Sequence, residues 1–388
     1  MALRMLADAA KIPLDQQVYG YVTLNGTFND IPRTFLLDTT LPGLAHRCAD
    51  HSLSLKSREK WNETCPRQCT SNLTIPMLAS EDMRAEVDPF AANLTFADIS
   101  IPNFKSGRVC NERSWKTFLN IKSTANGVFG LGPGAPKEYP KVTGALDSIP
   151  WSKYSIYLTK TARDVGSFLL PGGVDTDLIA KQSLTETKLP ATTETGWTVS
   201  VDAFSMTGAS INAECSSSNP CSATIAASSP VMQLGKSIWS SVMAGIDRRT
   251  CAKTFIFGDQ LLYECYGTDM LPNLMFTFGD RTLYMNATDY TIPIPRSDTR
   301  SVVVMISPQN YNRPYTAEWI LGTPFLRSFY SSFDKEAKTV SFYCKDGVNC
   351  AAKGKPPPGS PSSSGAPVSK WLRASVVFLA ATALVAVA

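Results

Sequence analysis

The sequence predicts a mainly β protein built from two related lobes. Glycine and proline are frequent, with 24 and 26 residues, and β-branched and aromatic residues fill the short runs between them. This texture is typical of short strands joined by turns. The 388 residues exceed the usual length of one domain, and the content of 44% hydrophobic and 18% charged residues fits a chain with a substantial core. The third observation is an internal repeat.

Two distant parts of the chain repeat one pattern. In the first part, an apolar strand ends at Asp38, and a later apolar segment ends at Gly130. In the second part, the matching positions are Ala226 and Gly322. Gly130 lies 92 residues after Asp38, and Gly322 lies 96 residues after Ala226. Similar units at similar spacing predict two homologous lobes.

The distribution of charge excludes one class of partner. The formal net charge is +4, and the basic residues are spread along the chain without a block of lysine and arginine. Proteins that bind nucleic acids carry a basic patch or stripe, so we expect no nucleic-acid partner. We also expect a monomer that holds no cofactor.

The cysteines and the N-glycosylation sequons indicate the secretory pathway. The zinc-site alternative rests on Cys65 and Cys69, which lie near His46 and His51. The chain has only two histidines, so disulfides are favoured and we expect no metal site. The five sequons begin at Asn25, Asn62, Asn72, Asn93 and Asn286, and the ten cysteines are Cys48, Cys65, Cys69, Cys110, Cys215, Cys221, Cys251, Cys265, Cys344 and Cys350.

Adjacency predicts three disulfides in the second half of the chain. Short loops close easily, so each cysteine there is expected to bond to its neighbour in the sequence. The four cysteines of the first half allow three pairings, and these stay open. The expected bonds are Cys215–Cys221, Cys251–Cys265 and Cys344–Cys350.

Five further segments follow one another at a characteristic spacing. They are Val18–Gly26, Asn126–Gly132, Gly166–Asp175, Cys265–Tyr290 and Trp319–Asp334. In this order they resemble the pepsin-like aspartic proteases from about residue 18 to residue 343, as the entry hairpin, the apolar-Gly segment, the start of the second lobe, a run within that lobe and the closing strand and helix. In that family each lobe has a strand that ends in Asp-Thr-Gly and a later apolar-apolar-Gly strand beneath it.

The resemblance implies an all-β, bilobal pepsin-like fold, in which two homologous β-barrel-like lobes enclose a central cleft. We expect the N-terminal lobe at residues 14–165 and the C-terminal lobe at residues 166–346. A Pro/Ser/Gly linker at 347–370 and a hydrophobic tail at 371–388 follow.

Catalysis in this family needs two carboxylates side by side, one ionised and one protonated. Asp38 matches the first carboxylate, and the second position is occupied by Ala226. The disulfide loop Cys215–Cys221 anchors this alignment, because such a loop can precede the second aspartate in the family. No Asp or Glu occurs between Glu214 and Asp247, so a shift in register cannot restore the site. We therefore interpret Asp38 as the remnant of a broken pair.

Neighbouring residues depart from the family in the same direction. The threonine that should mirror Thr39 is Ala227, and Thr40 and Ser228 replace the two glycines. No tyrosine occurs between residues 22 and 138, where the flap of the family carries one. The sequence therefore lacks three separate parts of the catalytic machinery.

Catalytic roles are not favoured for the single polar residues. Without its partner, Asp38 before Thr-Thr at a strand end is expected to be an ordinary solvated or capping turn residue, and Asp202, in a stretch that resembles a surface hairpin, is expected to be ordinary as well. Ser228 and Ser229 do not form a serine nucleophile site, because neither histidine lies in a recognisable triad setting.

The C-terminal segment resembles a GPI-attachment signal. Small residues, a polar spacer and the apolar run 374–388 follow one another, and that run of 15 residues is shorter than the roughly 20 that span a bilayer. The candidate attachment sites are Ser362, Ser363 and Ser364, and a short tail anchor or a non-functional end is the alternative. Residues 1–11 contain no signal-peptide run, which suggests a truncated start.

Three functions are compatible with these observations. The leading one is a catalytically inactive homologue on the extracellular face of the plasma membrane, which binds a peptide, protein or glycan through its cleft. The second is a weak or atypical aspartic endopeptidase. The third is a passive glycosylated coat protein.

Overall fold

The structure is a computed structural model of the chain. Contacts divide it into a unit Met1–Pro358 and a tail Gly359–Ala388, and every described residue belongs to the first unit. The described residues are 10–17, 20–47, 70, 73–77, 80–109, 125–133, 151–161, 164–192, 196–207, 215–244, 246, 251–254, 261–269, 271–294, 300–309 and 319–355. Within these ranges only the backbone is described at 42, 47, 73–77 and 80–86.

Strands make up nearly all of the regular structure, which confirms the predicted all-β class. The first strands are β1 (Ile12–Gln16), β2 (Val22–Phe28), β3 (Ile31–Asp38), β4 (Pro42–Arg47), β5 (Leu73–Met77), β6 (Ser80–Phe96), β7 (Ile99–Val109) and β8 (Gly127–Leu131). The elements that follow are β9 (Lys153–Tyr157), β10 (Phe168–Pro171), helix α3 (Thr176–Gln182) and β11 (Leu184–Pro190).

The remaining elements belong to the second half of the chain. They are β12 (Thr198–Val201), β13 (Ala203–Met206), β14 (Cys221–Ile225), β15 (Met232–Leu234), α4 (Lys236–Ala244), β16 (Cys251–Thr254), β17 (Leu262–Tyr266), β18 (Leu274–Phe278), β19 (Arg281–Met285) and the 3₁₀ turn η3 (Ala287–Asp289). They continue with β20 (Thr291–Pro293), β21 (Ser301–Val304), β22 (Ile306–Pro308), β23 (Trp319–Leu321), α5 (Thr323–Ser328), β24 (Tyr330–Asp334), β25 (Thr339–Lys345) and β26 (Cys350–Ala352).

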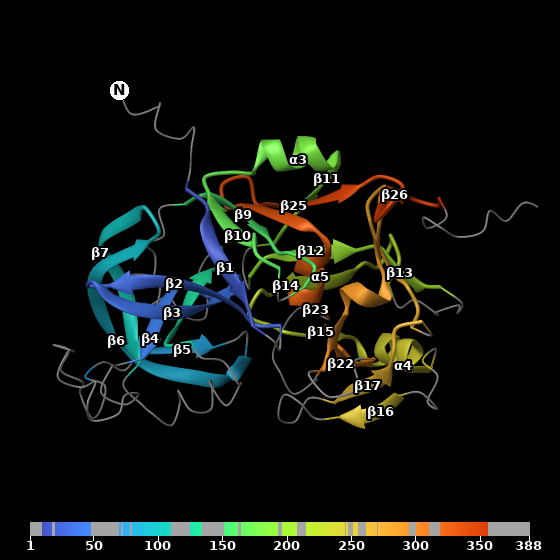
Figure 1. Ribbon diagram of the computed structural model, residues 1–388, viewed down its shortest axis with the longest axis horizontal. Coiled ribbons are helices and arrows are strands. Elements are labelled where there is room, and N and C mark those ends of the chain that lie inside the picture. Colours follow the sequence, from blue (N-terminus) through green and yellow to red (C-terminus); the bar gives the residue numbers. More distant parts are fainter. Residues whose placement is uncertain are drawn as a thin grey trace, which may run out of the picture. The chain divides into compact units, whose positions relative to one another are not determined.

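One sheet topology occurs twice. Strands β2-β3-β8-β4-β7 lie side by side in the first half, and β12-β14-β23-β15-β22 lie side by side in the second. Figure 1 shows β2, β3, β4 and β7 in one part of the fold and β12, β14, β23, β15 and β22 in another. The senses of the pairings also agree in order: antiparallel, parallel, antiparallel, parallel. This duplication confirms the bilobal fold that the repeat predicts.

A central sheet joins the two halves of the chain. The strand order in this sheet is β11-β25-β24-β9-β10-β1-β2. The N-terminal strand β1 pairs with β10, and β9 pairs with β24, which lies near the end of the chain. Because β1 alternates buried and exposed residues, one face of this strand packs on the core. The boundary that we predict at residues 165 and 166 falls just before β10 and stays a prediction.

The core of the second lobe is aromatic. All six residues of α5 are buried, and its Phe325 packs edge-on against Phe276 and Phe342, with ring centroids 5.5 and 5.0 Å apart. Edge-to-face pairs are favourable because the positive ring edge meets the negative ring face. This packing holds α5 directly after β23 and therefore fixes Gly322 between them.

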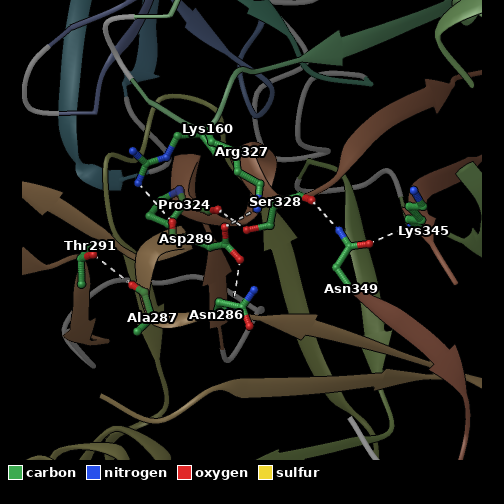
Figure 2. A network of polar contacts seen from close by, with 10 residues as sticks. All are labelled: Lys160, Asn286, Ala287, Asp289, Thr291, Pro324, Arg327, Ser328, Lys345 and Asn349. Atoms are coloured by element: carbon green, nitrogen blue, oxygen red, sulfur yellow. Dashed lines mark hydrogen bonds and ion pairs between the residues drawn. The ribbon is translucent and has the colours of Figure 1, made fainter. Parts of the chain in front are cut away.

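A polar network crosses the buried side of α5 (Figure 2). A nitrogen of the buried Arg327 guanidinium donates to the main-chain carbonyl oxygen of Asp289 at 3.2 Å. The carboxylate of Asp289 is also buried, and it accepts from the Lys160 ammonium at 3.2 Å and from the Asn286 N–H at 2.9 Å. Burial lowers the pKa of Arg327 to about 10, and the nearby Asp289 charge opposes this shift. The network joins the loop after β9 to η3 and α5.

Three disulfides are present among the described residues. They are Cys215–Cys221, Cys251–Cys265 and Cys344–Cys350, the bonds expected from adjacency. The cysteines at 48, 65, 69 and 110 lie outside the described residues. Within the described ranges, no helix has the length and apolar content needed to cross a membrane.

Candidate functional site

Asp38 and Ala226 occupy matching places in the two halves of the fold. Asp38 is the last residue of β3 and pairs with Gly130 of β8 in a parallel register. In the second half, Ile225 pairs with Leu321 in a parallel register, which puts the next residue, Ala226, beside the residue after β23. The Ala226 N–H donates to the Leu321 carbonyl oxygen at 3.0 Å.

Position 130, which pairs with Asp38, must be glycine because the chain passes very close to two carbonyl oxygens there. A Cβ on Gly130 would lie 2.1 Å from the carbonyl oxygen of Leu41 and 2.4 Å from that of Gly43. These carbonyls belong to the turn three and five residues after Asp38. The strand β8 therefore passes in direct contact with the turn that holds the carboxyl group.

Gly322 repeats this contact in the second half. A Cβ there would lie 2.5 Å from the carbonyl oxygen of Ser229 and 2.2 Å from that of Val231. These are three and five residues after Ala226, the same offsets as in the first half. The matching collisions make Ala226 the structural equivalent of Asp38, independently of any sequence alignment.

The Asp38 carboxyl group is fully buried and strongly hydrogen-bonded on one side. Its Oδ1 accepts from the Thr40 N–H at 2.6 Å, from the Thr40 hydroxyl at 2.6 Å and from the Leu41 N–H at 3.3 Å. Burial raises the pKa of Asp38, and the contacts with Thr40, Leu41 and Ser228 lower it without cancelling the effect of burial. Oδ2 is buried and has no hydrogen-bond partner among the described residues. This environment favours the neutral carboxylic acid.

Thr40 does more than replace a glycine. Its hydroxyl occupies a hydrogen-bonding position on Asp38 that a glycine could not fill. On the other side, Ala226 and Ala227 are 1% and 0% exposed and offer only methyl groups. The site therefore holds one carboxyl group, with two methyl groups where a second carboxyl and a hydroxyl would complete a symmetric pair.

Half of the reciprocal contact between the lobes remains. The buried Thr39 hydroxyl donates to the Ile225 carbonyl oxygen at 2.6 Å and accepts from the Ala227 N–H at 3.0 Å. Because Ala227 has no hydroxyl, the mirror contact from the second half is lost, as the sequence predicts. One hydroxyl then holds the two turns together.

Two aromatic side chains hold the neighbouring strand. The Tyr154 hydroxyl and the Trp197 indole N–H both donate to the carbonyl oxygen of Leu131, at 2.8 and 3.0 Å. Burial raises the pKa of Tyr154 well above its usual value, the contact with Trp197 opposes this shift, and the charge of Asp38 adds to it. These contacts tie β9 and the residue before β12 to the end of β8.

The arrangement limits the chemistry that is available. The influences on the pKa of Asp38 are burial and hydrogen bonds, and no second charged group is among them in the described part of the chain. A pair can serve as acid and base together because close like charges push its two pKa values apart. Among the residues that the structure describes, Asp38 has no such partner, so there a single carboxyl group is available for one proton exchange.

Replacing Asp38 by asparagine is expected to stabilise the protein as the pH rises. Asn keeps an acceptor for Thr40 and Leu41 but cannot ionise. The folded protein holds the Asp38 proton to a higher pH than the unfolded chain does, so the favourable contribution is complete below the unfolded pKa of about 4 and is lost as the pH rises through the folded pKa. Thermal melts of both proteins between pH 4 and pH 8 measure the difference, which should grow with pH in favour of Asp38→Asn.

Asp202 provides the matched control. Its carboxylate also accepts from a main-chain N–H, that of Gly279 at 2.6 Å, but the residue is only partly buried. The difference between Asp202→Asn and the native protein is the baseline for the difference between Asp38→Asn and the native protein. Parallel melting curves for Asp38→Asn and the native protein would contradict the raised pKa of Asp38.

The other predicted residues lie in several settings. Asp202 caps the β18–β19 turn, which agrees with its reading as a turn residue. His46 is buried between the rings of Phe28 and Phe90, in a packing role. The sequon residues Asn25, Asn93 and Asn286 are exposed, as glycan attachment requires. The sequons at 62 and 72, residue 51, and the serines at 362–364 lie outside the described residues, and Ser229 donates to the Val231 carbonyl oxygen.

The hydroxyl contacts with Asp38 could not be predicted from the sequence in detail. Thr40 and Ser228 stand out there only as residues that replace glycines, and the structure turns both side chains toward the carboxyl group. The sequence does not indicate that Tyr154 and Trp197 share the Leu131 carbonyl oxygen, because the fold brings that acceptor to them. Their residue types indicate only that each needs some hydrogen-bond partner when it is buried.

Comparison with known proteins gives a consistent result. The family described as "Eukaryotic aspartyl protease" matches residues 83–344. Gastricsin from Oryctolagus cuniculus is 25% identical over 255 residues, which cover 64% of this chain and 61% of that protein. Gastricsin from Homo sapiens is 26% identical over 258 residues, with coverage of 64% and 61%.

A shorter match extends the comparison. Renin-2 from Mus musculus is 26% identical over 83 residues, which cover 21% of this chain and 21% of that protein. The chain thus spans about three fifths of the length of the gastricsins that it matches, and a smaller part of this renin.

Proposed function

The chain belongs to the eukaryotic aspartyl protease family, and from this premise we propose that it is a catalytically inactive member that binds a peptide, protein or glycan through the cleft between its lobes. The observation that carries the proposal is the equivalence of Ala226 and Asp38, defined by the matching contacts of Gly322 and Gly130. The position of one carboxylate in the family is occupied by a methyl group.

The loss of one carboxylate affects both halves of the reaction. In the family one carboxylate takes a proton from a shared water while the other donates to the peptide carbonyl. Asp38 is buried, favours its neutral form and already accepts from the Thr40 hydroxyl. A single carboxyl group cannot take the proton of the water and donate one to the carbonyl at the same time, so the concerted transfer is the step that this chain is expected to lack.

Retained contacts between the lobes support a role in binding. The Thr39 hydroxyl still bridges to Ile225 and Ala227, and Trp197 still reaches the Leu131 carbonyl. These buried contacts hold the two halves in a defined arrangement, which a binding cleft between them requires. Concave sites between structural units are the usual places for ligands, which favours the cleft as the binding region.

We expect no endopeptidase activity between pH 2 and pH 8. Proton-transfer assistance by positioned groups is worth about 10² to 10⁴ in rate, and the missing pair would supply it twice while positioning the water. The assay is incubation of the glycosylated chain with a broad peptide library, followed by mass spectrometry of the products.

The Asp38→Ala variant serves as the control for contaminating proteases. Cleavage that both proteins show equally comes from a contaminant. Cleavage that the native protein shows and Asp38→Ala lacks would mean that Asp38 is catalytic, and the chain would then be a weak or atypical aspartic endopeptidase.

The disulfides and the family together indicate a secreted or extracellular protein. We propose further that it is held on the outer face of the plasma membrane by a GPI anchor added at one of Ser362, Ser363 or Ser364. The proposal rests on the sequence pattern of small residues, polar spacer and apolar run.

The anchor can be tested on cells. The chain with a working signal peptide should appear on the surface and be released by a phosphatidylinositol-specific phospholipase. Replacing the three serines by bulky residues, for example Ser→Trp at each, should abolish surface display because the attachment site needs small residues. Protein that stays on the membrane after the enzyme treatment and keeps its uncut tail would refute the GPI proposal.

A further inference from the structure

A groove lies along the free edge of β11, in the second half of the chain. It has a volume of about 410 Å³, within the range of ligand sites. Neither β11 nor the β18–β19 turn contributes a residue to the contacts around Asp38 described above. The lining residues are Thr185, Glu186, Thr187, Lys188, Leu189, Pro190, Ser200, Asp202, Phe278, Gly279, Asp280 and Arg281.

The groove follows the edge of the strand and not one of its faces. Successive residues of a strand point to opposite faces, yet all six residues from Thr185 to Pro190 line the groove. Among the described strands, β11 is also the last one of the central sheet, and its one neighbour there is β25 (Figure 1). The side of β11 away from β25 therefore faces the groove.

The register shows which backbone groups point into the groove. In an antiparallel pair, residues alternate between those that bond to the partner strand and those that point away. Pro190 faces Thr339 and has no N–H, while the next residue, Ala191, donates its N–H to the Lys338 carbonyl oxygen at 2.9 Å. Counting back in steps of two from Pro190, the N–H and C=O groups of Lys188 and Glu186 point away from β25.

We propose that this groove binds an extended, basic peptide segment of a partner protein, which pairs with β11 as an added strand. The backbone of Glu186 and Lys188 supplies donors and acceptors at the two-residue spacing that an extended chain matches. An unpaired strand edge is a template for such pairing. The buried Phe278 and Leu189 add an apolar floor for side chains of the segment.

The charges of the groove select the chemistry of the segment. Arg281 forms an ion pair with Asp346, so its charge is compensated within the protein. The other charged residues that line the groove are Glu186, Asp202 and Asp280 on the acidic side and Lys188 on the basic side. This excess of carboxylates attracts a segment that carries lysine or arginine and disfavours an acidic one.

The test uses the full chain and two labelled six-residue peptides, one alternating lysine with threonine and the other alternating glutamate with threonine. Fluorescence anisotropy at low salt should detect binding of the basic peptide, and the acidic peptide should bind at least tenfold more weakly. Equal binding of both peptides, or of neither at millimolar concentration, would overturn the proposal.

Two variants of one residue separate backbone pairing from charge. Lys188→Pro removes the outward N–H, which makes no bond to β25, and edge strands accept proline at such positions. It should weaken binding of the basic peptide at least tenfold. Lys188→Ala keeps the N–H, removes the competing positive charge and should bind this peptide as well as or better than the native chain. Equal binding by the two variants would show that no strand is added.

A side-chain variant protects the test against misfolding. If Lys188→Pro lowers the melting temperature strongly, Asp280→Lys replaces it, because Asp280 is exposed and lies in a turn. Asp280→Lys should weaken binding of the basic peptide and strengthen binding of the acidic one. An unchanged preference in this variant would overturn the assignment of the groove as the site.

Discussion

Replacing Ala226 by aspartate is expected to lower the free energy of unfolding at pH 7 by about 3 to 4 kcal/mol, without restoring proteolysis. Ala226 is 1% exposed, and the N–H of the next residue, Ala227, donates to Thr39, which follows the buried Asp38. Two carboxyl groups in one buried site cannot both ionise cheaply, so the variant must hold an extra proton or accept a buried charge. The loss should be small near pH 4 and grow as the pH rises. Denaturant unfolding at both pH values measures it.

Ala226→Asn is the matched control for this experiment. It has nearly the same shape as the aspartate variant and cannot ionise, so its effect should not depend on pH. A difference between the two variants that grows from pH 4 to pH 7 isolates the buried charge. If Ala226→Asp is as stable as Ala226→Asn at pH 7, the carboxyl group reaches water, and the description of a closed site is wrong. Substantial proteolysis by Ala226→Asp would contradict a second expectation, that Thr40, Ala227 and the missing flap tyrosine prevent catalysis even when the second aspartate is present.

Replacing Arg327 by alanine is expected to destabilise the second lobe by about 3 to 5 kcal/mol. The buried guanidinium lies beside Asp289 and donates to its carbonyl oxygen, so its removal leaves a buried carboxylate with less compensation and an empty volume in the core (Figure 2). Thermal and denaturant unfolding at neutral pH measure the loss.

Two variants divide the effect between charge and packing. Arg327→Met fills most of the volume without the charge, and it should recover part of the loss. Lys160→Ala removes the other cation at Asp289, but the Lys160 side chain is 64% exposed, so the expected loss is below about 1 kcal/mol. If Lys160→Ala costs as much as Arg327→Ala, the ion pair at the surface and not the buried guanidinium stabilises this region.

The bilobal fold and the missing carboxylate could both be predicted from the sequence, for one physical reason. Gly130 and Gly322 must be glycine because the strands below the turns pass in contact with carbonyl oxygens. Such a contact requires a glycine at a nearly fixed number of residues after the turn. The similar spacing of Gly130 and Gly322 from their turns identifies Asp38 and Ala226 as counterparts. The three disulfides were predictable in the same way, since each closes a short loop within a local hairpin or turn.

Features that depend on distant contacts could not be predicted. The groove along β11 also involves the β18–β19 turn, about 90 residues later in the sequence. The contact between Arg327 and Asp289 joins a helix to a 3₁₀ turn, and nothing in either local sequence indicates the pairing. The same holds for Tyr154 and Trp197, which share the Leu131 carbonyl only after β8, β9 and the bend before β12 have come together. Local patterns specify strands and turns, while these contacts arise from the topology that combines them.

The central sheet has a consequence for the order in which the chain can fold during synthesis. β1 pairs with β10, and β9 pairs with β24, so the first strand waits for residues near 170 and that part of the sheet is completed only when residues near 334 have left the ribosome. Contacts this distant in sequence form slowly, because a long loop must close before any of them is made. Until then the side of β9 that β24 covers in the finished sheet remains unpaired, and such an edge invites association with other chains. The nascent protein therefore exposes one strand edge from about residue 157 until residues near 334 are available.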